Sequence, residues 1–228
     1  MTESVPLIVT RPRPGNAATV ERARALGLDA RAVPLFAARP LEWEVPQAGR
    51  FDALLLTSAQ AVRLAGPGLA GLASLPVHAV GAATARAAEA AGMTVATTGS
   101  AGAEQLLDAV TSDKIQKILW LCGRDRSEFD AGRTVVEPLP CYTVDSLPPP
   151  TEWFDLIAAP AVLLAHSARA ARRLSSLVGD ARAHLALVAI SPGAAAAAGG
   201  GWRDLAVATR PDDAAMLAAG HALCHKGG

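Results

Sequence analysis

The chain repeats part of itself at a spacing of about 110 residues, and this repeat limits its fold more than any other feature. Ser58 aligns with Ser167, and further on Gly81 aligns with Ser191. A period this long does not suit a solenoid and fits duplication of one domain. The alternative is that any two strand–helix units look alike in an alanine-rich chain. The aligned segments, which fall in one order, are 52–63 with 161–172, 77–85 with 187–195, and 95–97 with 207–209.

Each copy alternates short apolar runs with alanine-rich stretches. The apolar runs lack polar alternation, which is typical of strands buried on both faces of a parallel sheet. The alanine-rich stretches predict helices, two of which end at Gly27 and Gly92. We therefore expect an α/β fold with helices on both sheet faces. The predicted strands are Pro6–Thr10, Ala30–Phe36, Ala53–Thr57, Val77–Gly81, Thr94–Thr98, Ile118–Gly123, Val135–Val144, Ala161–Ala165, Ala186–Ile190 and Leu205–Thr209.

The segments outside the aligned pieces also correspond, since 7–36 parallels 119–142. The chain thus has four parts, a first and a second part from each copy. In a tandem arrangement, each first part pairs with the second part that follows it. In a crossed arrangement, the second and third parts of the chain pair, and the first joins the fourth. Two proline-rich connectors, Arg39 to Gln47 and Ser146 to Thr151, favour the crossed one. It gives a discontinuous domain of residues 1–37 and 146–228, with an α/β domain of residues 38–145 inserted into it. Two adjacent connectors predict a hinge over an interdomain cleft, where ligands commonly bind.

Composition excludes several classes of protein. The 21 basic and 21 acidic side chains balance, with no basic block, so nucleic acid is not an expected partner. No apolar run is long enough to span a membrane, and no basic segment precedes the first strand as in a signal peptide. Three cysteines cannot pair completely, which fits a reduced, cytoplasmic location.

Motifs for cofactors and metals are weak. The segment Gly66–Gly71 matches G-x-G-x-x-G, but it follows a predicted helix and precedes a strand, the wrong order for a dinucleotide site. His221, Cys224 and His225 would share a helix face, yet three groups at a chain end fit tail residues better than a zinc site. We therefore expect no cofactor and no metal.

Small hydroxyl or glycine residues end nearly every predicted strand, just before a helix. One interpretation is helix capping. The other is ligand binding, because open α/β sheets bind ligands beyond the carboxyl ends of their strands, where helix N-termini attract anions. Arg11, Arg63, Arg86 and Arg124 lie near these ends, either to meet carboxylates or as solvated surface charges. The small candidates are Thr10, Ser58, Gly81, Thr84, Ser167, Ser191 and Gly193.

Tyr142 is the only tyrosine of the chain and lies in the run Cys141–Val144. One interpretation is an aromatic side chain of a strand or the core. The other is a phenol that donates a proton or a hydrogen bond in the cleft.

Together these segments resemble uroporphyrinogen-III synthase. The resemblance covers almost the whole chain, and its strength lies in the order and spacing of the pieces. The matching pieces are Val9–Pro12, Leu56–Val62, Val80–Ala85, Gly102–Leu107, Cys141–Tyr142, Ser167–Ala168 and Ala189–Pro192. The family implies two flavodoxin-like parallel-sheet domains joined by a two-stranded β-ladder hinge, in the crossed arrangement.

The family also implies an activity: a cofactor-independent lyase closes hydroxymethylbilane, a linear tetrapyrrole with eight carboxylates, to uroporphyrinogen III. Water is lost and the last ring is inverted. Tyr142 matches the family's functional tyrosine, Thr84 matches a cleft threonine, and Gly102 lies in a matching piece. The candidate substrate-binding residues are thus Thr10, Arg11, Ser58, Gly81, Thr84, Gly102, Ser167, Ser191 and Gly193. A monomer that receives its substrate from hydroxymethylbilane synthase is implied as well.

The segment Ser191–Ala194 departs from the family pattern. Members often show Gly-Pro-Thr-Thr where this chain has Ser-Pro-Gly-Ala, so both threonine hydroxyls are missing. Ser191 is a partial replacement, and Gly193 keeps a backbone N–H. The departure leaves a second hypothesis open: an inactive relative that binds an anionic ligand or acts as a regulatory module.

Overall fold

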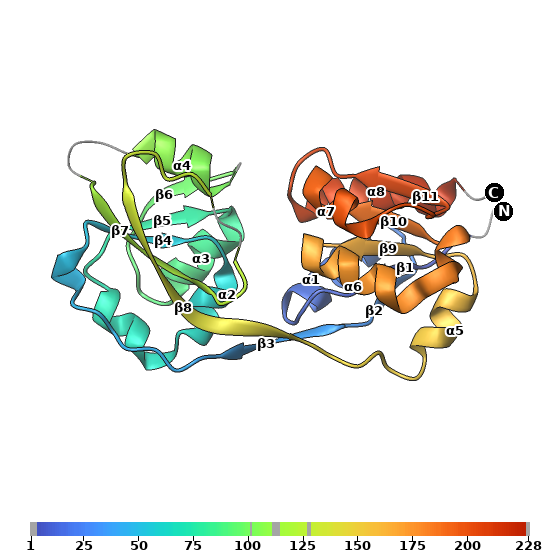
Figure 1. The fold of residues 1–228 in the computed structure, drawn as a ribbon, viewed down its shortest axis with the longest axis horizontal. Helices are drawn as coiled ribbons and strands as arrows, with labels where there is room; N and C mark the ends of the chain where they lie inside the picture. The colour runs from blue at the N-terminus through green and yellow to red at the C-terminus, as the bar shows by residue number, and fades with distance from the viewer. Residues whose placement is uncertain (1–3, 101, 111–114, 127–128, 227–228) are drawn as a thin grey trace. The chain divides into compact units, whose positions relative to one another are not determined.

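The computed structural model describes residues 4–100, 102–110, 115–126 and 129–226. The chain divides into two compact units. Unit 1 contains Met1–Ala37 and Ser146–Gly228, and unit 2 contains Ala38–Asp145. Each unit has one sheet with helices packed on both faces (Figure 1).

The sheet of unit 1 has the strand order β11-β10-β9-β1-β2, and all of its strand pairs are parallel. Numbered along the unit, this order is 2-1-3-4-5, the order of flavodoxin-like folds. Every residue of β1, β9 and β10 is buried, which explains why these runs are apolar without alternation. The strands are β1 (Leu7–Val9), β2 (Ala30–Ala32), β9 (Val162–Ala165), β10 (Ala186–Ala189) and β11 (Asp204–Val207).

Helices cover both faces of this sheet. On one face, α1 (Gly15–Ala25) and α8 (Asp213–His225) pack side chains such as Val20 and Met216 against Leu164. The other helices are α5 (Trp153–Ala158), α6 (Ala168–Val178) and α7 (Pro192–Ala198), with a 3-10 helix at Gly179–Ala183. Because α6 and α7 pack against each other and against β9 and β10, they form the second helical layer.

The sheet of unit 2 has the order β3-β8-β7-β4-β5-β6. Its helices α2 (Ala59–Leu64) and α3 (Ala82–Ala90) pack on the face that carries Leu54, and α4 (Ala103–Val110) packs on the face that carries Leu55. The strands are β3 (Phe36–Pro40), β4 (Ala53–Leu56), β5 (Val77–Val80), β6 (Val95–Gly99), β7 (Lys117–Gly123) and β8 (Val135–Ser146). The 3-10 helices are Ala48–Arg50 and Gly66–Leu72.

The two sheets share one strand order. The series β2-β1-β9-β10-β11 in unit 1 corresponds to β8-β7-β4-β5-β6 in unit 2. The aligned segments of the sequence thus occupy equivalent strands, as duplication of one domain requires. Strand β1, from the first part of one copy, pairs with β9, from the second part of the other copy. Strand β7 pairs with β4 in the same way, so the chain has the crossed arrangement.

The chain passes between the units twice, through β3 and β8. Leu41 N–H donates to the Cys141 carbonyl at 2.9 Å, and Leu147 N–H donates to the Leu35 carbonyl at 2.8 Å, so the two segments run antiparallel. Arg39 and Asp145 form an ion pair across them.

One predicted strand is wrong. The run Ala30–Phe36 forms two strands, β2 and β3, which belong to different sheets. Pro34 lies between them and has no N–H for a ladder, which favours a break there. The connector expected from Arg39 begins inside β3, where Pro40 ends an edge strand, the position in a sheet that tolerates proline.

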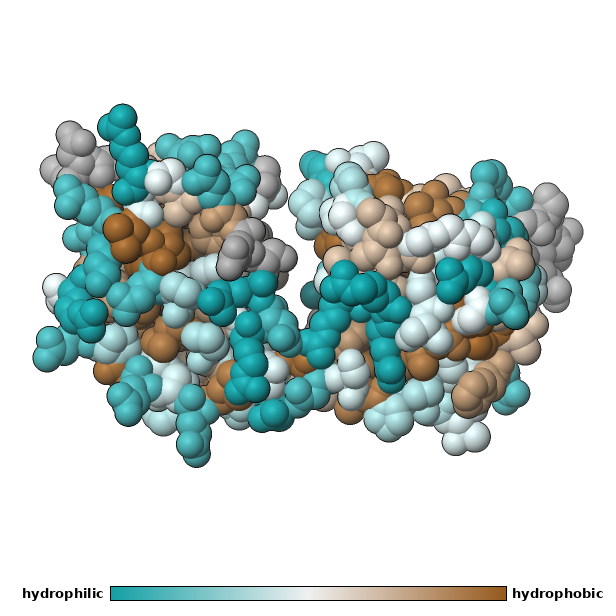
Figure 2. Space-filling model, viewed as in Figure 1, coloured by the Kyte–Doolittle hydropathy of each residue, from teal (hydrophilic) through white to brown (hydrophobic). Residues whose placement is uncertain are grey.

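Hydrophilic side chains cover much of the face shown for each unit, with smaller apolar areas between them (Figure 2). Within the described residues, no helix is long and apolar enough to cross a membrane.

Candidate functional site

Unit 2 contains a cavity of about 480 Å³ beyond the carboxyl ends of β4 and β7. These two strands are neighbours in the sheet. The chain continues from β7 to β8 on one side of the pair and from β4 to β5 on the other side, so the strand order changes direction here, which makes this the switch point of the sheet. Crevices at such points are the usual ligand sites of open α/β sheets. The lining residues are Thr57, Ser58, Val80, Gly102, Ala103, Glu104, Trp120, Cys122, Gly123, Asp125, Arg126, Phe129 and Tyr142.

Tyr142, on β8, forms one wall of this cavity, and its ring lies against the backbone of Gly123 on β7. A methyl group on Gly123 would lie 2.9 Å from Cζ and 3.1 Å from the phenol oxygen of Tyr142. The ring can take this place only because residue 123 has no side chain.

The Tyr142 phenol stays protonated at neutral pH. Burial raises its pKa above the ordinary value, and a hydrogen bond with the Ser58 side chain offsets part of that rise. The phenol is therefore a hydrogen-bond donor on the cavity wall. Ser58 has a second task, because its Oγ accepts from Gln60 N–H at 3.2 Å and caps α2.

Another part of the cavity lining is aromatic. The rings of Trp120 and Phe129 lie 4.7 Å apart, and the Arg126 guanidinium lies 5.7 Å from the Trp120 ring centre. The indole Nε1–H donates to Thr57 Oγ1 at 3.1 Å, which fixes the plane of the ring. An aromatic wall with a guanidinium beside it suits a flat ligand that carries carboxylates.

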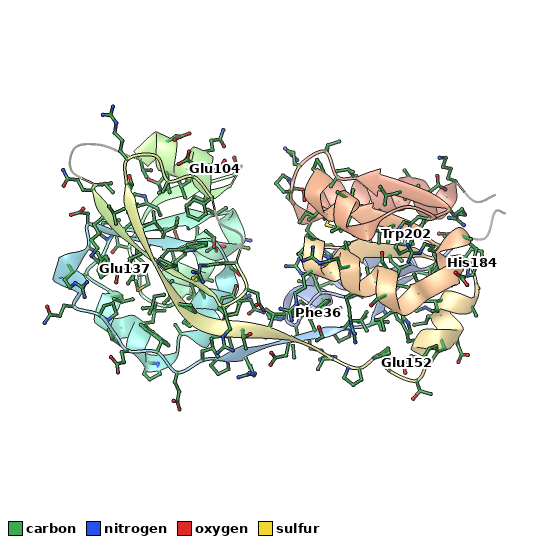
Figure 3. The ribbon with its side chains drawn as sticks, viewed as in Figure 1. Phe36, Glu104, Glu137, Glu152, His184 and Trp202 are labelled. Atoms are coloured by element: carbon green, nitrogen blue, oxygen red, sulfur yellow. The ribbon has the colours of Figure 1, made fainter. Side chains whose placement is uncertain are left out.

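Glu104 extends from α4 at this cavity (Figure 3). Its Oε1 accepts from Asp130 N–H at 3.1 Å, which fixes the carboxylate on the neighbouring loop. Burial raises the pKa of the Cys122 thiol to about 11 and that of Cys141 to about 12, so neither is an activated nucleophile. The cavity supplies hydrogen bonds and shape, with a neutral phenol as its donor.

The structure brings Tyr142, Ser58 and Gly102 together among the predicted site residues. Gly102 has a φ of +113°, a conformation that favours glycine. Gly81 (φ +84°) precedes α3 at the carboxyl end of β5, and Thr84 is buried within α3; neither lines the cavity.

The remaining predicted residues belong to unit 1. Thr10 is fully buried, and its hydroxyl donates to the Leu164 carbonyl at 3.3 Å. Arg11 follows β1 and forms an ion pair with Asp213. Gly193 lies in the first turn of α7, where a Cβ atom would lie 4.0 Å from Ser191 Oγ.

Helix capping, the first interpretation of the strand ends, is confirmed at three serines. Ser58, Ser167 and Ser191 each accept a bond from the first turn of the helix that follows. It is wrong for Thr10, because Pro14 occupies the N-cap position of α1.

Sequence patterns missed several residues of the cavity and one residue of unit 1. Trp120, Phe129 and Arg126 line the cavity, and His166 meets Asp213 in unit 1 at 3.3 Å. For His166 the repeat of the sequence offered a signal, because this residue aligns with Thr57 at the end of the equivalent strand. Over the described parts of the chain, no group of three or more His, Cys, Asp and Glu side chains could hold a metal ion.

Comparisons with known proteins agree on one family. The family model described as uroporphyrinogen-III synthase HemD matches residues 17–218. A uroporphyrinogen-III synthetase structure from Helicobacter pylori has a TM-score of 0.61 at 15% identity, covering 96% of this chain and 99% of that one. A mutant uroporphyrinogen III synthase structure from the extremely thermophilic bacterium Thermus thermophilus has a TM-score of 0.53 at 20% identity, with the same coverage. Both show the fold. No curated protein sequence matches the chain.

Proposed function

The chain belongs to the uroporphyrinogen-III synthase family, and we propose that it closes hydroxymethylbilane to uroporphyrinogen III with inversion of the last ring. The observation that carries this proposal is the family match over residues 17–218. The unit 2 cavity supports it, because a neutral phenol and an aromatic wall lie together at a switch point of the sheet.

The proposed reaction is a dehydration in which no electrons are gained or lost. The C–O bond of the hydroxymethyl group breaks, the departing oxygen takes a proton and leaves as water, and an azafulvene cation remains. The last ring's substituted carbon attacks this cation to give a spiro intermediate. In that intermediate, the bond breaks between the substituted carbon and the methylene that joined the last ring to its neighbour, which gives a second azafulvene cation. The unsubstituted α-carbon of the last ring then bonds to this methylene carbon and loses its ring proton. The protein holds the chain folded and stabilises the developing charge.

We assign the hydrogen bond to the departing hydroxyl to Tyr142. Because its pKa is raised, the phenol acts as a hydrogen-bond donor rather than as a strong acid. The enzyme is proposed to be a lyase that needs no cofactor and works as a cytoplasmic monomer. It would take its substrate from hydroxymethylbilane synthase.

The substrate contacts are proposed to be those that the sequence indicates. Backbone N–H groups and hydroxyls at the strand ends would meet the carboxylates. These residues are Thr10, Arg11, Ser58, Gly81, Thr84, Gly102, Ser167, Ser191 and Gly193. For Thr10 this requires a local rearrangement, because the side chain is fully buried.

The segment 191–194 motivates a second candidate function. The Ser191 hydroxyl oxygen is already the cap of α7 and accepts from Ala194 N–H at 3.3 Å. It replaces the two missing threonine hydroxyls only in part. A member that binds an anionic ligand without catalysis, or acts as a regulatory module, is therefore the alternative.

A coupled assay separates the two. Hydroxymethylbilane is generated in place, and the porphyrin isomers are separated after oxidation. Mostly type III product without added cofactor supports the synthase. Only type I, the isomer that forms without a synthase, contradicts the proposal and favours the inactive relative.

A further inference from the structure

The loop between β7 and β8 differs from the equivalent connection in unit 1. In unit 1 the chain passes from β1 to β2 through the helix α1. Between β7 and β8, the described residues 124–126 and 129–134 form no helix. This loop instead contributes Asp125, Arg126 and Phe129 to the lining of the unit 2 cavity. The two copies of the domain therefore present different side chains beyond equivalent strands.

Arg126 is an exposed cation at this cavity and has no acidic partner among the described residues. Its guanidinium makes one long hydrogen bond, from Nη1 to the Arg124 carbonyl at 3.5 Å. Burial raises the pKa of the Cys122 thiol and the Arg126 charge lowers it in part, so the guanidinium lies close to the end of β7. Most of its N–H donors therefore face the cavity or solvent rather than the protein.

The guanidinium of Arg126 lies over the ring of Trp120. Its Cζ atom is 5.7 Å from the ring centre, within the range of a cation–π contact. The indole is itself fixed, because its Nε1–H donates to Thr57 Oγ1 at 3.1 Å and the Phe129 ring centre lies 4.7 Å away. A planar cation held on a fixed ring loses little side-chain freedom when it binds an anion. Trp120 is only 6% exposed, so it acts on a ligand mainly through the guanidinium.

A second arginine–tryptophan pair, in unit 1, shows how a structural pair differs. The Arg182 guanidinium lies 5.8 Å from the Trp202 ring centre. Its Nε, Nη1 and Nη2 each donate to a backbone carbonyl at 3.0 Å, so this cation joins segments of its own unit. Arg126 has the same aromatic support without those bonds, which favours a ligand as its partner.

Negative side chains limit where a ligand carboxylate can lie in the cavity. Glu104 and Asp125 are also lining residues, and their charges repel a carboxylate. The position beside Arg126 is therefore the favourable one, and the flat guanidinium can bind a carboxylate through two parallel hydrogen bonds. The unit 2 cavity is thus suited to one carboxylate rather than to several.

We propose that Arg126 binds one carboxylate of the tetrapyrrole substrate in the cavity of Tyr142, and that Trp120 is a positioning residue for its guanidinium. This inference rests on the proposed function, which supplies a ligand with eight carboxylates. It adds a side-chain cation to a cavity whose other proposed contacts are neutral. The competing view is that Arg126 only covers the indole of Trp120 and contributes nothing to binding.

The first test is Arg126→Gln, which removes the charge and leaves a polar side chain. We expect the KM for hydroxymethylbilane and the Kd for uroporphyrin III, a stable octacarboxylate, to rise about 10-fold with kcat nearly unchanged, because a charge-assisted hydrogen bond is lost. The urea midpoint should stay the same, since Arg126 is exposed. Arg126→Lys keeps the charge without the planar fork and should recover only part of the affinity.

The second test is Trp120→Leu, which removes the ring under the guanidinium. In the wild-type background it should raise both constants about 3-fold, the order of one cation–π contact. In the Arg126→Gln background it should cause almost no further change, because the ring acts through the guanidinium. A merely structural role would lower the urea midpoint and raise both constants equally in the two backgrounds.

Two controls match these variants. Arg133→Gln removes an exposed guanidinium from the other end of the same loop, next to the amino end of β8. Trp202→Leu removes the ring of the second pair, which precedes the amino end of β11. Both controls should keep the wild-type KM and Kd, which excludes a general effect of net charge or of a lost indole.

Each outcome decides a separate point. If Arg126→Gln leaves KM and Kd unchanged, or if Arg133→Gln raises them as much, the inference fails, while type III product from the wild type still supports the proposed function. If Trp120→Leu costs as much in both backgrounds, the role of Trp120 is refuted. If the wild type binds uroporphyrin III through Arg126 yet forms only type I product, the binding site stands and the proposed function fails. If the wild type neither binds uroporphyrin III nor forms type III product, both proposals fail.

Discussion

At the scale of single residues, two glycines leave room for the side chain of a proposed site residue. The ring of Tyr142 lies against Gly123, and the guanidinium of Arg11 lies against Gly15. Neither glycine has a positive φ, so neither is needed for its backbone conformation. The space that the missing side chain leaves is the reason for glycine at both positions.

Gly123→Ala should therefore lower activity without unfolding the protein. The added methyl group would lie 2.9 Å from Tyr142 Cζ, so the ring must shift, which disturbs its hydrogen bond with Ser58. We expect kcat to fall about 10-fold, which corresponds to about 1.4 kcal/mol and lies within the net value of one hydrogen bond. Steady-state kinetics on hydroxymethylbilane measure this. Gly49→Ala, where a methyl group meets nothing within 4 Å, is the control, and an equal loss there would refute the explanation.

Tyr142→Phe tests the hydroxyl itself, because the ring remains. We expect kcat to fall about 10-fold and the free energy of unfolding to change by about 1 kcal/mol, the net value of one hydrogen bond. Since burial raises the Tyr142 pKa above 10, ionisation of the phenol should not limit kcat between pH 6 and pH 9. Unchanged turnover in the variant would remove Tyr142 from the mechanism.

Sequence patterns could predict only part of the site. Tyr142 and Ser58 stood out as a unique tyrosine and a repeated serine at a strand end. The aromatic wall could not be predicted, because Trp120 reads as one more apolar residue of a buried strand. Asp213 lies 202 residues from Arg11, so only the folded sheet and helix packing bring the two together.

At the scale of elements, burial explains which predictions were correct. The central strands are buried on both faces, so their sequences are continuous apolar runs that stand out from the helices. The split of Ala30–Phe36 was not predicted, because β2 and β3 join different sheets, and a local pattern does not record which sheet a strand joins.

Asp213 fastens α8 to α1 and to the end of β9, so Asp213→Asn should destabilise unit 1. The amide loses the charge that Arg22, Arg11 and Thr19 now contact. We expect a loss of about 2 kcal/mol in the free energy of unfolding at pH 7, since hydrogen bonds to a charged group are involved. Urea unfolding measures it.

The pH dependence of stability provides a second check on Asp213. Its folded pKa is lowered, so the carboxylate contributes stability above the unfolded value near pH 4 and loses it as the pH falls toward the folded pKa. The difference between wild type and Asp213→Asn should therefore be full at pH 6 and shrink below pH 4. A difference that stays constant from pH 6 to pH 3 would mean that the charge is not the source of the stability.

At the scale of the whole molecule, one strand order occurs twice with different chemistry at its switch point. In unit 2 the residue after β4 is Thr57, which accepts a bond from an indole in an aromatic cavity. In unit 1 the aligned residue is His166, which meets Asp213 in a charged cluster. Duplication explains the shared order. Equivalent strand ends carry different side chains, so unit 2 has an aromatic cavity where unit 1 has a charged cluster. The zero net charge of the whole chain does not reveal this difference.

Each unit also has its own hydrophobic core. We therefore expect a substitution in one core to destabilise mainly the unit that contains it. The core clusters around Leu54 and Leu55 contain only residues of unit 2, and the cluster around Leu164 contains only residues of unit 1. Leu54 and Leu163 occupy aligned positions of β4 and β9, and both are fully buried. Leu54→Ala and Leu163→Ala are therefore a matched pair, each expected to cost 2–5 kcal/mol, that is, about the usual range for a buried leucine.

Native-state hydrogen exchange distinguishes separate cores from a single cooperative unit. Leu54→Ala should speed exchange of backbone amides within residues 38–145 and leave those of β1, β9 and β10 nearly as protected as in the wild type. Leu163→Ala should do the reverse, because its lost packing lies in the other sheet. If either substitution accelerates exchange equally in both sheets, the units unfold together. The β3–β8 ladder would then couple their stabilities, although each sheet completes its own core.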